Sequence, residues 1–105
     1  MVSEEYSGKD LFVINDDLKE LIPHFVLHQF EELERMENSL DDGDLKDVAR
    51  LGHSLKGAAA NFCLDPLCRL GMAIQDVSKL GMKDALYPLV KKYRFYLEEL
   101  KIQVS

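Results

Sequence analysis

Three short breaks most constrain what this chain can fold into: Asp42-Gly43, Asp65-Pro66 and Gly81. Between them, apolar residues recur at intervals of three and four, which places them on one face of an α-helix. Glycine is favoured just after a helix, and proline is favoured in the first turn of the next one. The pattern therefore predicts four substantial amphipathic helices with short connections, an all-α fold that packs as an antiparallel up-and-down four-helix bundle.

A short additional helix is predicted ahead of these four. Asn15-Asp16-Asp17 carries short polar side chains that cap free amides, and acids that suit the positive end of a helix. Pro23 breaks or kinks this helix because proline lacks an amide hydrogen. The preceding apolar run, Leu11-Phe12-Val13-Ile14, has no second run to pair with as a strand. We therefore expect it to form an extended or single-turn segment that covers one end of the core.

The helix boundaries follow from the residues around each break. We expect Gly43 to end the second helix in a left-handed conformation, and Asp44 to cap the third with Asp47 at the capping-box position. Asp65 is expected to cap the fourth helix, and Gly81 to end it. The apolar stripes of the four long helices are Phe25, Val26, Phe30, Leu33, Met36 and Leu40; Leu45, Val48, Leu51, Gly52, Leu55, Ala59 and Phe62; Leu67, Leu70, Ile74 and Val77; and Leu89, Val90, Tyr93, Leu97, Leu100 and Ile102.

The last helix is expected to begin between Lys83 and Tyr87, and its cap has two interpretations. Pro88 is a comfortable first residue if Tyr87 is the cap, and it produces an early kink if the cap is Asp84. Both interpretations leave a helix that runs to the end of the sequence. We expect residues 1–105 to form a single domain, since a chain of this length supports one core.

His53 stands apart from the apolar stripe of its helix. On a helical wheel of about 100° per residue it falls about 140° from the centre of that stripe, so it is predicted to be exposed rather than buried in the core. Its neighbours on that face are small or basic, although the chain as a whole carries a net charge of −6. These neighbours are Lys46, Ala49, Arg50, Lys56, Gly57 and Ala60.

Such surroundings suit a histidine that carries a phosphoryl group. The neutral imidazole is a good nucleophile near pH 7, and Lys56 supplies a positive charge about one turn away on the same face. Gly57 removes the side chain that would crowd a group attached to the ring. The simpler interpretation is an ordinary surface histidine.

The segment His53-x-x-Lys56-Gly57, followed by Ala-Ala-Ala-Asn, resembles the signature of histidine-containing phosphotransfer (HPt) domains. The likeness runs from about Leu18 to Leu100. One departure is Cys63, where many relatives have a glycine just before the next helix. Three flanking stretches are also similar to the family pattern: Leu21-Ile22-Pro23-His24-Phe25, Gly43-Asp44 and Arg50-Leu51-Gly52.

The resemblance implies a phosphocarrier rather than an autonomous enzyme. An HPt protein accepts a phosphoryl group from a receiver-domain phospho-aspartate and passes it to another receiver aspartate in a phosphorelay. The implied partners are response-regulator receiver domains and a hybrid sensor histidine kinase. Mg²⁺ is expected on the receiver, and no cofactor is expected on this chain. The alternative is a helical-bundle interaction module that binds a receiver or kinase without carrying phosphate.

Two residues of the fourth helix are further candidates. If this helix packs antiparallel to the third, Gln75 can reach the far ring nitrogen of His53 or the phosphoryl oxygens, and HPt domains often have a polar residue facing the histidine there. Lys79, one turn further on, would add positive charge. For both residues a solvated helix face is the competing interpretation. The surface expected to bind a partner comprises Lys46, Ala49, Arg50, Ala60 and Lys79.

No metal is expected on this chain. Glu20, His24 and His28 are spaced four apart, as ligands on one helix face can be. They fall opposite the core stripe, however, and a metal site inside a bundle needs inward-facing Glu-x-x-His motifs from two helices. Cys63 and Cys68 lack metal-ligand spacing and are expected to be free thiols in a reducing cytoplasm.

Charge and hydropathy argue against several other classes of protein. A net charge of −6 disfavours nucleic acid as a partner, because its phosphates would be repelled. No apolar run approaches the ~20 residues that cross a bilayer, and we expect no signal peptide ahead of the fold. No glycine-rich nucleotide loop is present in the sequence, so an ATP site of the kinase type is not expected. We therefore expect a cytoplasmic protein that binds no membrane. A monomer is also expected, although these features do not bear on the oligomeric state.

Overall fold

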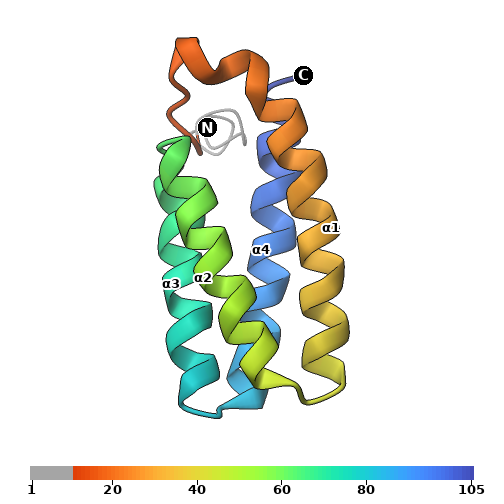
Figure 1. Cartoon of the computed structure of the whole chain (residues 1–105). Helices are drawn as coiled ribbons and strands as arrows, with labels where there is room; N and C mark the ends of the chain where they lie inside the picture. The colour runs from red at the N-terminus through yellow and green to blue at the C-terminus, as the bar shows by residue number, and fades with distance from the viewer. Residues whose placement is uncertain (1–10) are drawn as a thin grey trace, which may run out of the picture.

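Four long helices lie side by side in the computed structural model of the chain, which describes residues 11–105 (Figure 1). A short 3₁₀ helix lies across one end of the bundle, ahead of the first long helix. The elements are η3 (Asp16–Leu21), α1 (Ile22–Asp41), α2 (Leu45–Asn61), α3 (Asp65–Lys79) and α4 (Lys83–Gln103). The predicted all-α antiparallel four-helix bundle with a short additional N-terminal helix is confirmed.

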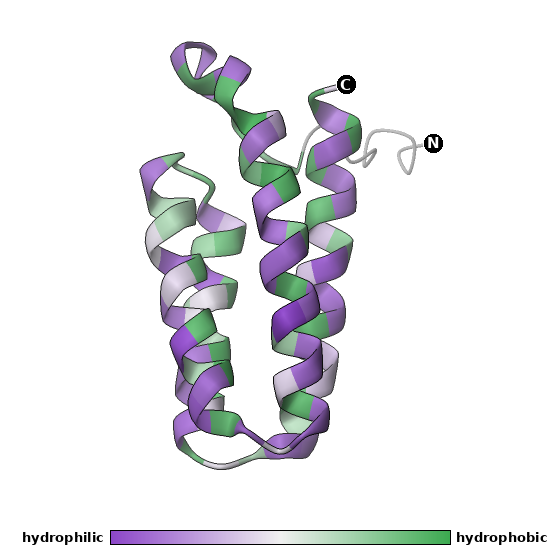
Figure 2. Cartoon of the chain, turned by 45° about the vertical axis from the view of Figure 1, so that its right-hand side comes forward, coloured by the Kyte–Doolittle hydropathy of each residue, from purple (hydrophilic) through white to green (hydrophobic). Residues whose placement is uncertain are grey.

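The helices pack through their apolar faces. Hydrophobic and hydrophilic residues alternate along all four of them (Figure 2), and most of the predicted stripe residues are buried or packed against the core. Ile102 is the exception, since its side chain is 62% exposed. It follows Leu97 by five residues, which turns it about 140° away from that buried leucine, so its assignment to the α4 stripe is wrong.

Left-handed residues end three of the long helices. Gly43 has φ +77° and Gly81 has φ +73°, as the sequence predicts. Cys63, between α2 and α3, adopts φ +57°. This conformation costs a residue with a side chain roughly 1 kcal/mol, a cost that a glycine would avoid.

The predicted caps of α2 and α3 are confirmed only in part. The Asp44 carboxylate does cap α2, accepting a hydrogen bond from the Asp47 amide at 3.1 Å. Asp47 itself is not a capping-box partner, because its carboxylate binds Ser39 and Arg50 instead. Asp65 is not a cap either. It is the first residue of α3, and the cap is Leu64, which makes no side-chain hydrogen bond.

The last helix begins within the predicted range, although neither predicted cap is the observed one. α4 starts at Lys83, with Met82 as its cap, so Pro88 lies inside the helix. Tyr87 is therefore not the cap, and Asp84 is an acidic residue of the first turn rather than the cap. Pro88 lies close enough to the helix start that it interrupts only one hydrogen bond near the free amides of the first turn.

The segment before η3 covers one end of the core, as predicted. Phe12 is buried, and its ring meets Tyr96 edge-on with ring centres 6.0 Å apart. The Phe12 amide donates to Gln103 Oε1 at 3.2 Å, and Gln103 Nε2 donates back to the Phe12 carbonyl at 2.6 Å. This paired contact joins the first described residues to the end of α4.

A polar pair lies inside the core between α1 and α4. Gln29 and Tyr93 are both buried, and the Tyr93 hydroxyl donates to Gln29 Oε1 at 2.5 Å. Burial, with a smaller contribution from the charge of Glu32, raises the pKa of Tyr93, so its hydroxyl stays protonated and remains a donor. The pair fixes the register of α1 against α4.

Tyr93→Phe should lower the free energy of unfolding by about 1–3 kcal/mol, because the buried Gln29 amide oxygen loses its donor. Urea denaturation followed by circular dichroism measures the change. Tyr96→Phe is the matched control on the same helix, since no hydrogen bond from the Tyr96 hydroxyl occurs in the described structure. Equal midpoints for the two variants would contradict a structural role for the Gln29–Tyr93 pair.

Candidate functional site

The candidate site is a groove of about 620 Å³ between α2 and α3. His53 lies on its rim and is exposed, as the helical wheel predicts. The groove brings together residues that are more than twenty positions apart in the sequence. Its lining is Leu45, Lys46, Ala49, Arg50 and His53 from α2, with Gln75, Ser78 and Lys79 from α3.

Three of the candidate residues lie outside this groove. Lys56 is half-buried, one turn beyond His53, and Gly57 and Ala60 are exposed further along α2. A Cβ atom built on Gly57 would have no neighbour within 4 Å. Gly57 therefore serves no packing purpose inside the chain, although a glycine within a helix costs about 1 kcal/mol relative to alanine. Its absent side chain leaves open space next to the face that carries His53.

A close crossing of α2 and α3 positions the two sides of the groove. A Cβ atom on Gly52 would lie 2.9 Å from the Gln75 amide nitrogen, and one on Gly71 would lie 2.7 Å from the Lys56 amide nitrogen. The backbones beside His53 and beneath Lys56 thus touch the opposite helix directly. Because backbone atoms cannot rotate away as a side chain can, this contact fixes where Gln75 lies relative to His53.

Gly71 was not among the predicted site residues, and Gly52 was named only in an apolar stripe and in one of the flanks that resemble the family pattern. A signal for both was present, since each is an isolated glycine inside a helical pattern, where glycine costs about 1 kcal/mol relative to alanine. Neither glycine contacts a ligand. They act on the site through the positions of His53, Lys56 and Gln75.

Positive charge around His53 is divided between free and paired side chains. Among the ion pairs of residues 11–105, none involves Lys46, Lys56 or Lys79. Arg50, by contrast, donates through Nε and Nη2 to Asp47 Oδ1 at 2.9 and 2.6 Å. An exposed pair of this kind contributes only about 0.2–1 kcal/mol to stability.

Asp47 is held from two sides. Its second carboxylate oxygen accepts a hydrogen bond from Ser39 Oγ on α1 at 2.6 Å. This hydrogen bond, followed by the hydrogen bond from Arg50, keeps the pKa of Asp47 below its usual value. Asp47 is therefore an ionised acceptor held in the first turn of α2, beside the groove residue Arg50.

The other two histidines belong to a different groove. His24 and His28 line a depression between the start of α1 and the end of α2, together with Phe25, Ala58 and Phe62. His28 Nδ1 lies 3.9 Å from Glu31 Oε1. Across the described chain, no three His, Cys, Asp or Glu side chains come close enough together to hold a metal ion.

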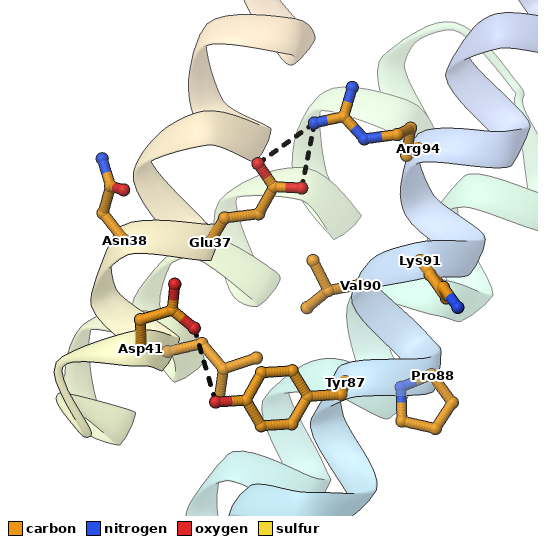
Figure 3. Close-up of a pocket in the computed structure, with 9 residues that line it drawn as sticks. Glu37, Asn38, Asp41, Tyr87, Pro88, Val90, Lys91 and Arg94 are labelled. Carbon is orange, nitrogen blue, oxygen red and sulfur yellow. Dashed lines mark hydrogen bonds and ion pairs between the residues drawn. The ribbon is translucent and has the colours of Figure 1, made fainter.

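A third groove, of about 670 Å³, lies between α1 and α4 on the opposite side of the bundle from α2 and α3 (Figure 3). Arg94 Nη2 crosses it to both carboxylate oxygens of Glu37, at 3.1 and 2.9 Å. The Tyr87 hydroxyl donates to Asp41 at 3.4 Å. Its charged groups are thus largely paired with one another, and no histidine or cysteine lines it.

Comparison with protein families gives one match. A family model described as Hpt domain matches residues 20–103, a span that includes all four long helices and the groove with His53. No curated protein and no solved structure matches the chain. Within residues 11–105, no helix is both long enough and apolar enough to span a membrane.

Proposed function

The chain belongs to the Hpt domain family, whose members transfer phosphoryl groups in phosphorelays, and we propose that His53 is the residue that carries the phosphoryl group. One observation carries this proposal. His53 is exposed on the rim of a groove lined by Lys46, Arg50 and Lys79, with no side chain at Gly57 to cover it. The exposure gives a partner access, and the positive charges suit a dianionic group.

In the proposed reaction, a receiver domain bearing a phospho-aspartate docks over the α2–α3 groove. The lone pair of the neutral His53 Nε2 attacks phosphorus in line with the acyl oxygen. A nitrogen–phosphorus bond forms as the phosphorus–oxygen bond breaks, and the aspartate leaves as a carboxylate with the electron pair. The proton on Nδ1 stays in place, so the step balances without a base. Reversal of the same step passes the group to another receiver aspartate.

The chain contributes positioning and charge to this reaction. Phosphoryl transfer has a loose transition state with charge spread over three oxygens, so positively charged side chains stabilise it. Each lysine at 4 Å from a unit charge is worth about 1 kcal/mol in water and about 4 kcal/mol at an interfacial dielectric constant near 20. The lysines around His53 therefore become more effective when a docked partner excludes water.

The remaining chemistry belongs to the partner. Mg²⁺ bound by the receiver domain would supply further positive charge to the phosphoryl oxygens. The proposed partners are response-regulator receivers and a hybrid sensor histidine kinase. The protein thus acts as a carrier and takes its phosphate from another phosphoprotein rather than from ATP.

A phosphotransfer assay tests the proposal. The chain is incubated with each of a panel of phosphorylated receiver domains, and the product is scored for phosphate that is labile in acid and stable in base, the behaviour of phosphohistidine. Transfer from at least one receiver is expected. Tight binding to a receiver without transfer would instead establish a non-catalytic interaction module.

Lys56→Ala is expected to slow transfer by about tenfold to a hundredfold, equivalent to roughly 1.4–2.7 kcal/mol of transition-state stabilisation. The reason is the loss of a positive charge one turn from His53 on the same helix. Single-turnover transfer from a saturating phosphorylated receiver measures the rate without a contribution from docking affinity. Lys83→Ala is the control, because Lys83 is the first residue of α4 and does not line the groove with His53. An unchanged rate for Lys56→Ala would mean that the receiver supplies the charge.

A further inference from the structure

Arg50 differs from the lysines around His53 because its side chain already forms an ion pair. Two of its N–H groups donate to Asp47 Oδ1, three residues earlier on the same helix. Arg50 nevertheless lines the groove with His53, three residues later. It therefore lies between an acidic residue on one side and the candidate phosphoryl-accepting residue on the other.

The two members of this ion pair are not equally free to move. The Asp47 side chain is 23% exposed and is also held by the Ser39 hydroxyl from α1. The Arg50 side chain is 58% exposed, and its bonds to Asp47 are the hydrogen bonds it makes within the described structure. If the pair opens, Asp47 keeps the Ser39 hydrogen bond and stays in place, whereas the Arg50 guanidinium becomes free to turn.

We propose that Asp47 is a positioning residue that binds Arg50 while His53 is unphosphorylated. When His53 carries a phosphoryl group, Arg50 leaves Asp47 and binds the phosphoryl oxygens instead. Residues three apart on a helix are neighbours, within the reach of an arginine side chain. A phosphoryl group offers up to two negative charges and three acceptor oxygens against the single charge of Asp47, and the planar guanidinium binds such groups through two parallel hydrogen bonds. This inference rests on the proposed role of His53.

With this exchange, the positive charge available at the site depends on whether His53 is phosphorylated. While His53 is free, the Asp47 carboxylate neutralises Arg50, and the lysines alone are available to an incoming phosphate. Once His53 is phosphorylated, Arg50 faces the phosphoryl oxygens, and the Asp47 carboxylate retains only Ser39. The helix backbone need not move, because only side-chain rotation is required.

A double-mutant cycle with a small-molecule donor tests the exchange without any protein partner. His24→Gln and His28→Gln leave His53 as the sole histidine of the chain. Phosphoramidate then phosphorylates His53 with loss of ammonia, and ³¹P NMR follows the rate in four proteins: this background, and the background with Asp47→Asn, with Arg50→Gln and with both. Asp42→Asn is the control, since it removes an exposed acidic charge five positions before Asp47, and Asp42 makes no hydrogen bond to Arg50.

Asp47→Asn should raise the phosphorylation rate by roughly two- to fivefold, the range that one exposed ion pair controls. The rise should vanish when Arg50 is already glutamine, and Asp42→Asn should give a much smaller rise. Equal acceleration by Asp47→Asn in both backgrounds would show a general charge effect and overturn the proposal, as would no acceleration.

The Arg50 Nε–H resonance gives a second readout, which needs no substitution at Asp47 or Arg50. It should move when His53 is phosphorylated in the otherwise unmutated background, and a resonance that stays in place would also overturn the exchange. Failure here is distinguishable from failure of the proposed function. If receivers transfer phosphate to His53 but the cycle is additive, the carrier role stands and the Arg50 exchange is wrong. If the cycle is coupled but no receiver transfers phosphate, the exchange stands and the carrier role in a phosphorelay is wrong.

Discussion

His53→Gln abolishes phosphate carriage and leaves the bundle folded: this is the expected result with the largest effect on function. The side chain is exposed and contributes nothing to the core, so its replacement should change the free energy of unfolding by less than about 0.5 kcal/mol. Glutamine keeps a polar group at the position but has no nucleophilic nitrogen at neutral pH. Transfer from a phosphorylated receiver, scored as acid-labile phosphate, measures the loss, and thermal unfolding checks the fold.

The matched controls for this variant are His24→Gln and His28→Gln. Both histidines lie on α1 and line the groove at the end of α2, so both variants should carry phosphate at the wild-type level. Acid-labile phosphate that persists in His53→Gln but disappears in one of these controls would move the carrier role to α1. Persistence in all three variants would mean that no single histidine is the sole carrier.

Gly71→Val should have the largest effect on stability, a loss of about 3 kcal/mol or more, at the upper end of the range for overpacking. A Cβ atom at this position would lie 2.7 Å from the Gly52 carbonyl oxygen and from the Lys56 amide nitrogen, and both are backbone atoms. The helices must separate to admit it. Since whole domains are stable by only about 5–15 kcal/mol, urea denaturation should show a clear fall in midpoint.

Gly57→Val is the control, because it makes the same chemical change on the partner helix. A Cβ atom on Gly57 would meet nothing within 4 Å, so its unfolding free energy should stay within about 0.5 kcal/mol of the wild type, helped slightly by the better helix propensity of valine. Comparable losses in the two variants would refute the close crossing of α2 and α3 at Gly71.

The bundle could be predicted from the sequence because its signals are local. Apolar spacing within each helix, together with glycines at positions 43 and 81, depends only on nearby residues, and the structure agrees. The errors arose where one residue type serves several roles. Asp47 stands at the capping-box position, but Ser39 and Arg50 offer stronger partners, and Ser39 comes from a helix whose approach no local pattern specifies.

The two sides of the groove also differ in how far the sequence predicts them. A helical wheel suffices to predict the exposure of His53, because exposure depends on one amphipathic helix. The proximity of Gln75 to His53 depends on how α3 crosses α2, and in the sequence this was conditional on antiparallel packing. Gly52 and Gly71 set that crossing, yet their contact joins residues from two helices, so neither sequence segment reveals it alone.

The close α2–α3 crossing also has a consequence for the order in which the chain folds. These two helices are consecutive, are joined by a short connection and share the most extensive contact of any helix pair. The Phe12–Gln103 contact, in contrast, must close a separation of 91 residues, and long loops are entropically slow to close. We therefore expect the α2–α3 hairpin to form early and open last. His53 would then keep its neighbours on α2 and α3 while the contact between Phe12 and Gln103 breaks and forms again.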